Sequence, residues 1–125
     1  MLKRFAVLAF AVLATACSAT PEAGDDCSPE GAIACESTSQ ALFCQGGKLV
    51  AVPCRGAAGC ITNNERGTCD LTRALAGDAC PSAVANQGQC DANNANRLLR
   101  CTSGTWTAEV CNGCAVQGSS IYCQP

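Results

Sequence analysis

Histidine is absent from this chain of 125 residues. Imidazole is the commonest general base and the commonest metal ligand in proteins, so its absence argues against a histidine-dependent hydrolase and against a zinc site. The acidic residues are scattered, and no two of them are placed as the paired carboxylates of a glycosidase would be. We therefore expect a protein that is not an enzyme and that has no catalytic residues, no metal site and no cofactor.

Basic and aromatic residues are also few. Eight Lys and Arg against ten Asp and Glu give a net charge of −2, and without a basic patch the chain is not expected to bind nucleic acid. After residue 16 the only aromatic residues are Phe43, Trp106 and Tyr122. Apolar burial alone can therefore do little to offset the entropy lost when the backbone becomes ordered. The chain needs cross-links.

Cysteine supplies the cross-links. The chain has thirteen cysteines, and setting aside Cys17, which stands apart from the others, leaves twelve, an even number. This density is typical of disulfide scaffolds in exported proteins, because disulfides persist outside the cytoplasm. We expect all twelve to form disulfides: Cys27, Cys35, Cys44, Cys54, Cys60, Cys69, Cys80, Cys90, Cys101, Cys111, Cys114 and Cys123.

The first sixteen residues have the layout of a signal peptide. Lys3 and Arg4 precede an uninterrupted apolar run over residues 5–14, and small residues follow, ending at Ala16. Ten apolar residues span about 15 Å as a helix, roughly half the hydrocarbon thickness of a bilayer. We expect residues 1–16 to be removed on export.

The residues around the cleavage point distinguish anchoring from free secretion. Leu13, Ala14 and Ala16 before Cys17 resemble a bacterial lipobox, and this resemblance implies a diacylglycerol group on Cys17. The protein would then be held to the membrane through that lipid, with residues 17–26 as a polar tether. We expect a cell-envelope location, as an outer-membrane lipoprotein or, if an ordinary signal peptidase cuts, as a secreted protein.

An internal repeat organises the rest of the chain. The six cysteines from Cys27 to Cys69 recur, 53 to 57 residues later, from Cys80 to Cys123, and the third and fourth cysteines of each copy are equally spaced. We call residues 27–70 module 1 and residues 80–125 module 2, with residues 71–79 as a linker.

Each module has the pattern of a β-hairpin. A short apolar run, residues 41–44 or 98–101, is followed by a glycine-containing turn and then by an extended run, residues 49–52 or 106–110. A third short strand is expected around Cys69 and around residues 121–123. The predicted fold is small, disulfide-rich and mainly β, with two tandem modules that each contain a hairpin and a third strand. The sequence leaves open the pairing of the cysteines, since six allow fifteen arrangements.

Two motifs invite a functional interpretation. Cys111 and Cys114 have the two-residue gap of redox and zinc motifs, but five residues separate their counterparts Cys54 and Cys60, which indicates a shortened loop in module 2. Trp106 and Tyr122 are candidates for stacking on a sugar ring. Since the counterpart of Trp106 is Leu49, packing in the core is the favoured alternative for that position.

The repeat resembles known cysteine-rich families. Residues 30–35, 42–44, 47–49 and 54–60 of module 1, and their counterparts in module 2, resemble the repeats of small cysteine-rich secreted lipoproteins of myxobacteria. They are also similar to the six-cysteine chitin-binding modules of some fungal chitinases. In those modules a tryptophan tends to stand where this chain has Leu49, and only module 2 retains it, as Trp106.

These observations favour a non-enzymatic, surface-anchored or secreted lipoprotein that acts as a binding or structural module, with a glycan or a protein as ligand. One alternative is a carbohydrate-binding module for a chitin-like glycan. Another is a small protease inhibitor, in which the disulfide-framed residues 57–64 would present a rigid segment.

Overall fold

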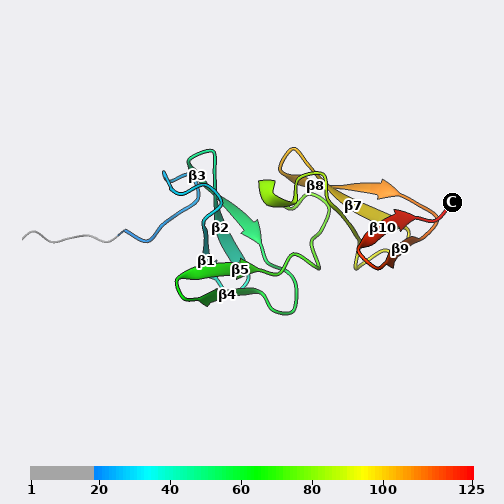
Figure 1. Cartoon of the computed structure of the whole chain (residues 1–125), viewed down its shortest axis with the longest axis horizontal. Coiled ribbons are helices and arrows are strands. Elements are labelled where there is room, and N and C mark those ends of the chain that lie inside the picture. The colour runs from blue at the N-terminus through cyan, green and yellow to red at the C-terminus, as the bar shows by residue number, and fades with distance from the viewer. Residues whose placement is uncertain (1–18) are drawn as a thin grey trace, which may run out of the picture.

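The computed structural model describes residues 19–125 and confirms a small, mainly β, disulfide-rich fold (Figure 1). The predicted signal peptide and the predicted lipid site at Cys17 lie outside the described residues. Within residues 19–125, the structure has no helix of the length and apolarity needed to cross a membrane.

Module 1 consists of a three-stranded antiparallel sheet and a separate two-stranded hairpin. The strand order in the sheet is β1-β2-β3, and the hairpin pairs β4 with β5. The strands are β1 (Ile33–Ser37), β2 (Gln40–Gln45), β3 (Lys48–Pro53), β4 (Cys60–Asn63) and β5 (Arg66–Cys69).

Module 2 repeats this arrangement. A short 3₁₀ turn η1 (Ser82–Val84) precedes the sheet β6-β7-β8, and β9 pairs with β10. The predicted hairpins are β2–β3 and β7–β8, and the predicted third strands are β5 and β10; β1, β4, β6 and β9 were not predicted. The strands are β6 (Gly88–Cys90), β7 (Arg97–Thr102), β8 (Thr105–Val110), β9 (Cys114–Gln117) and β10 (Ser120–Cys123).

The turn residues explain the hairpin register. Gly46 and Gly47 both have positive φ, as do Ser103 and Gly104 at the equivalent turn. Two consecutive residues of positive φ form the tight turn whose twist matches that of antiparallel strands. The turns therefore fix Gln45 opposite Lys48, and Thr102 opposite Thr105.

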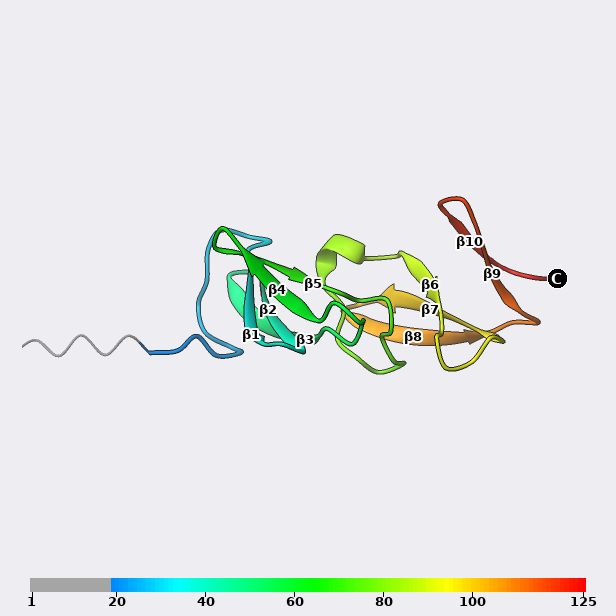
Figure 2. The ribbon, with the colours of Figure 1, turned by 90° about the horizontal axis from the view of Figure 1, so that it is seen from below.

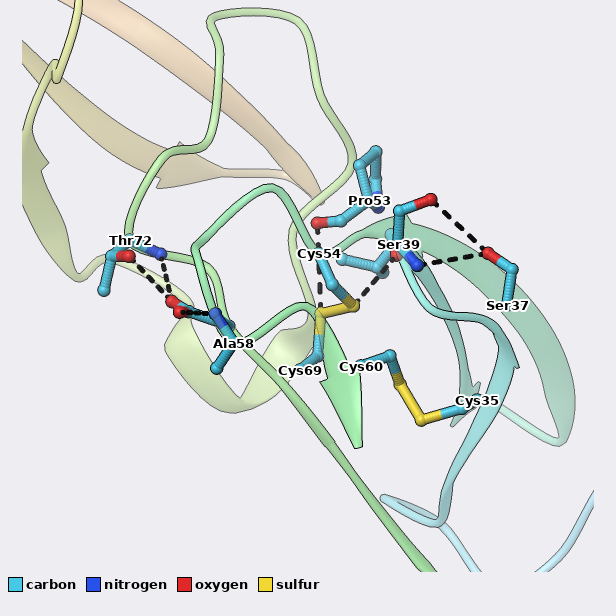
Figure 3. Close-up of a disulfide and its surroundings, with 11 residues drawn as sticks. Cys35, Ser37, Ser39, Pro53, Cys54, Ala58, Cys60, Cys69 and Thr72 are labelled. Atoms are coloured by element: carbon cyan, nitrogen blue, oxygen red, sulfur yellow. Dashed lines mark hydrogen bonds between the residues drawn. A yellow bond between two sulfur atoms is a disulfide. The ribbon is translucent and has the colours of Figure 1, made fainter. Parts of the chain in front are cut away.

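The disulfides follow one scheme in both modules. In module 1 the first cysteine pairs with the third, the second with the fifth and the fourth with the sixth; the last two of these bonds lie close together in Figure 3. Module 2 repeats the first two pairings. The bonds are Cys27–Cys44, Cys35–Cys60, Cys54–Cys69, Cys80–Cys101 and Cys90–Cys114.

The structure differs from the prediction at the last pair. Cys111 and Cys123 form no disulfide with any cysteine of residues 19–125. The physical reason lies in the hairpin that carries Cys123, because β9–β10 projects from its sheet whereas β4–β5 lies alongside β1–β3 (Figure 2). A hairpin that packs less closely on its sheet holds Cys123 less firmly towards Cys111, and the two thiols are not joined.

We name the two faces of each three-stranded sheet by their position relative to the separate hairpin, β4–β5 in module 1 and β9–β10 in module 2. The hairpin face carries Cys35 or Cys90, the cysteine bonded to β4 or β9, and the other side is the opposite face. Since side chains alternate along a strand, the registers assign every residue to one face. In module 1 the hairpin face holds Ile33, Cys35, Ala41, Phe43, Val50 and Val52.

The main buried cluster lies on a different face in each module. The core of module 1 is on the hairpin face, where Ala41, Phe43 and Val52 pack with the half-buried Ile33 and Val50. The core of module 2 is on the opposite face and contains Leu99, Cys101 and Trp106, covered by Ala74 and Cys80. The repeated backbone therefore supports two differently placed cores.

Side chains connect the linker to each of the two modules. The Arg55 guanidinium donates to the Asp78 carboxylate, with Nε 2.6 Å from Oδ2 and Nη2 2.9 Å from Oδ1. Asp78 also accepts the Leu75 backbone N–H at 2.9 Å. From module 2, Gln89 Nε2 donates to the Leu71 carbonyl of the linker at 2.9 Å. These bonds order the linker against both modules.

The hydrogen bonds from Arg55 and Leu75 hold the pKa of Asp78 below its usual range, although partial burial opposes them. Replacing Asp78→Asn should lower the free energy of unfolding at pH 7 by about 1–2 kcal/mol, because the Arg55 donors lose their charged acceptor. Guanidinium denaturation of the oxidised protein measures this loss.

The matched control is Asp25→Asn, since Asp25 is the exposed counterpart of Asp78 in the repeat and, among residues 19–125, its carboxylate accepts only the Glu22 backbone N–H. A carboxylate with a lowered pKa stabilises the fold above its usual pKa and loses that effect as the pH falls through the lowered value. The difference between wild type and Asp78→Asn should therefore disappear towards about pH 2. An equal effect of both variants at pH 7 would contradict this role.

Candidate functional site

The opposite face of module 1 forms a groove. Because the core of this module is on its hairpin face, the other side of β1–β3 is left to the N-terminal segment, and the space between them measures about 720 Å³. Ala34 on β1, Leu42 on β2 and Leu49 on β3 lie on this face. The wall of the groove comes from residues 25–28 and from Glu65 at the β4–β5 turn.

The groove combines an apolar floor with acidic edges. Leu49 is half-buried and Ala34 is exposed, so these two side chains offer aliphatic surface along the sheet, whereas Leu42 is 2 % exposed and offers almost none. The carboxylates of Asp25, Asp26 and Glu65 lie at its margin and are exposed. Ligand sites typically join an apolar surface to a few polar groups that fix orientation. Carboxylate oxygens accept hydrogen bonds from hydroxyl groups.

Backbone pairing holds the wall of the groove in place. Gly24 N–H donates to the Leu49 carbonyl at 2.8 Å, and Leu49 N–H donates to the Asp25 carbonyl at 2.9 Å. The Lys48 ammonium lies 2.6 Å from Asp26 Oδ1. The last residues of the predicted tether therefore run along β3 as part of the site, and the Cys27–Cys44 disulfide fastens them to the sheet.

Sequence reasoning missed the acidic edge of this groove. The acidic residues were described as scattered, and none of Asp25, Asp26 and Glu65 was singled out. Their proximity depends on two features, the bridge between Asp26 and Lys48 and the β4–β5 turn at Asn64 and Glu65. The turn has a sequence signal, since asparagine tolerates positive φ, but the position of the hairpin relative to the sheet has none.

Trp106 is not placed for stacking on a ligand. Its side chain is only 3 % exposed and packs in the core of module 2 against Leu99 and Cys101. The structure therefore favours the core-packing alternative for Trp106 over the ligand-stacking one. Its indole N–H is buried without a hydrogen-bond acceptor among the described residues, so Trp106 contributes through its apolar area.

Tyr122 lies apart from the groove. It is on β10 opposite Ala115, and its ring is 41 % exposed. The stacking role of Tyr122 stays a prediction. Module 1 has a single aromatic residue, Phe43, which is buried on the hairpin face and so does not reach the groove.

The predicted inhibitor segment, residues 57–64, is mostly engaged in structure. Its second half is β4, which pairs with β5, and its first half is held by Asp70, whose carboxylate accepts the Ala58 N–H at 3.1 Å (Figure 3). Hydrogen bonds from Thr72 and Ala58 hold the pKa of Asp70 below its usual range. The segment is therefore a packed hairpin arm. Among residues 19–125, no three acidic or cysteine side chains are grouped as metal ligands.

The buried position of Trp106 gives a direct test of the core of module 2. Trp106→Ala should lower the free energy of unfolding by about 3–5 kcal/mol, because a large buried ring is replaced by a cavity. Leu49→Ala, at the matched position of module 1, should cost much less, since Leu49 is half-buried beside the groove. Chemical denaturation of the oxidised proteins measures both, and an unaffected Trp106→Ala variant would contradict the assignment.

The comparisons with known proteins concern module 1. A family model described as carbohydrate binding domain (family 19) matches residues 8–65, less than half of the chain. Every residue that lines the groove falls within this match, whereas module 2 lies outside it. No curated protein and no solved structure gives a significant match. Over its first module, the chain is therefore similar to a carbohydrate-binding domain.

Proposed function

We propose that this protein is a non-enzymatic carbohydrate-binding protein that holds a chitin-like polysaccharide in the groove of module 1. The observation that carries the proposal is a coincidence of position: the residues matched by the carbohydrate-binding family model include the entire lining of the groove. This replaces the general binding or structural role with the first of the two alternatives raised by the sequence.

The chemistry of the groove suits an N-acetylated sugar chain. A pyranose ring has an apolar face formed by its C–H groups, which fits the aliphatic surface of Leu49 and Ala34. The sugar hydroxyls and the amide N–H are donors, and Asp25, Asp26 and Glu65 offer acceptors at the edge. In place of an aromatic platform, the groove has Leu49, so each sugar ring gains contact area without the specific geometry of stacking.

Leu49 is the residue to test. Leu49→Ser should reduce retention on insoluble chitin about tenfold or more, because the loss of about 1.4 kcal/mol of apolar contact equals a factor of ten in affinity. The measurement is a depletion isotherm with the folded, oxidised protein on chitin, with cellulose as a second matrix.

The matched control is Ile61→Ser. Ile61 is an aliphatic residue of β4 with 46 % of its surface exposed, and it does not line the groove. We expect this variant to bind as wild type does. Equal weakening by both substitutions would indicate nonspecific adsorption, and wild-type retention by Leu49→Ser would rule out the groove as the site.

The anchoring of the protein is a second part of the proposal and depends on the sequence. A lipid on Cys17 would hold the groove close to a membrane surface, since the lining of the groove begins at Ala19 and Pro21. The intact mass of protein purified from a bacterial membrane fraction should show an N-terminus at Cys17 carrying acyl groups. An unmodified chain in the medium would show a secreted protein and would leave the glycan proposal unaffected.

A further inference from the structure

The hairpin face of module 2 is polar where that of module 1 is apolar. The repeat places Arg100, Thr107 and Glu109 at the positions that Phe43, Val50 and Val52 occupy in the core of module 1. Arg100 Nε lies 3.2 Å from Glu109 Oε1, and both side chains are substantially exposed. Leu98, buried on the same face, is therefore the one large apolar side chain of the β6-β7-β8 sheet on which the β9–β10 hairpin can pack.

A second exchange between the modules concerns the contact of sheet and hairpin. In module 1, Ile33 of β1 lies against Gly67 of β5, where an added Cβ would come within 2.9 Å of Ile33 Cγ2. In module 2 the two residue types are reversed, with Gly88 on β6 and Ile121 on β10. In both modules, an isoleucine on one element therefore corresponds to a glycine on the other.

In the structure this second contact is open. Gly88 and Ile121 line opposite sides of a cleft of about 330 Å³, together with Gln87, Leu98, Arg100 and Ser119. The β9–β10 hairpin is attached to the sheet by the Cys90–Cys114 disulfide and projects away from it (Figure 2). Closure of the hairpin would bring Ile121 over Gly88, as Ile33 lies over Gly67.

The two thiols of module 2 lie where closure would join them. Cys111 and Cys123 are the counterparts of Cys54 and Cys69, which are bonded in module 1. The neighbouring Cys111 thiol and, less strongly, burial raise the pKa of Cys123 to about 11, so Cys123 keeps its proton at neutral pH. Cys111 directly follows β8, two residues after Glu109, so it stands at the end of a strand of the polar face.

We propose that Cys111 and Cys123 form a reversible disulfide that closes the β9–β10 hairpin over the polar face of module 2, and that this redox latch opens under conditions in which the five other disulfides persist. The inference concerns module 2 alone and does not depend on glycan binding by module 1.

The Cys111–Cys123 bond forms by thiol–disulfide exchange with the disulfide of a dithiol oxidoreductase. One thiol of the pair loses its proton and attacks the disulfide of the partner, which releases one thiolate and leaves a mixed disulfide. The second thiol then loses its proton and displaces the other sulfur of the partner. The pair loses two electrons and two protons, and the partner becomes a dithiol.

The polar face explains why this bond is the weakest of the six. In module 1 the Cys54–Cys69 bond joins surfaces that also pack through Phe43 and Val52, so the folded state favours it. In module 2 the same closure covers the Arg100–Glu109 pair, and removing charges from water opposes it. The Ile121–Gly88 contact offsets this only in part.

The test is a reductant titration of the folded, oxidised protein. Aliquots equilibrated with increasing dithiothreitol are alkylated and mapped by mass spectrometry. Cys111 and Cys123 should become labelled at about tenfold lower dithiothreitol than Cys54 and Cys69, a difference of roughly 30 mV for a two-electron couple. Simultaneous labelling of both pairs, or an oxidised protein in which Cys111 and Cys123 are never joined, would overturn the latch.

A double variant tests whether the polar face makes the Cys111–Cys123 bond easier to reduce. Arg100→Phe with Glu109→Val installs the residues of module 1, and it should move the labelling of Cys111 and Cys123 towards that of Cys54 and Cys69. The control Ser119→Ala changes a cleft residue without altering charge and should leave the midpoint unchanged. If the double variant has the wild-type midpoint, the polar face does not control the latch.

Discussion

The structure depends on the disulfide that joins each three-stranded sheet to its hairpin, Cys35–Cys60 in module 1 and Cys90–Cys114 in module 2. These bonds span 25 and 24 residues and connect elements that share few or no ladder hydrogen bonds. Closing loops of this length removes about 3 kcal/mol of unfolded-state freedom for each bond in the chain-entropy model. In a chain with five aromatic residues, that contribution allows so small a core to suffice.

Because these disulfides hold the sheet to its hairpin, the sheet does not need to bury one particular face to stay attached. A sheet held only by packing must keep its apolar face towards the rest of the protein, whereas a sheet tied by sulfur can bury either face. Module 1 buries the side with Phe43, and module 2 buries the side with Trp106. The side left over becomes the groove in one copy and the polar cleft in the other. The two candidate sites thus arise from the same freedom.

The sequence predicts the local features well because they depend on neighbouring residues. The β2–β3 and β7–β8 hairpins follow from turns at Gly46 and Gly104, and the duplication follows from cysteine spacing. The strands β1 and β6 are short and were missed, since their pairing depends on a distant strand. The polar residues Arg100, Thr107 and Glu109 on one side of the β7–β8 hairpin are a local signal for the buried face of module 2. The segment around Ala74 that covers Trp106 has no such signal, because its position depends on a fold over the sheet.

The opposite placement of the two cores has a consequence for valency. Duplicated binding modules often gain affinity because the second site binds at a high effective concentration once the first is occupied. Here the surface that forms the groove in module 1 corresponds to the surface that Trp106 fills in module 2. Within residues 19–125 the duplication therefore gives this groove in module 1 alone, and avidity for a polymer would come from the density of chains on a surface.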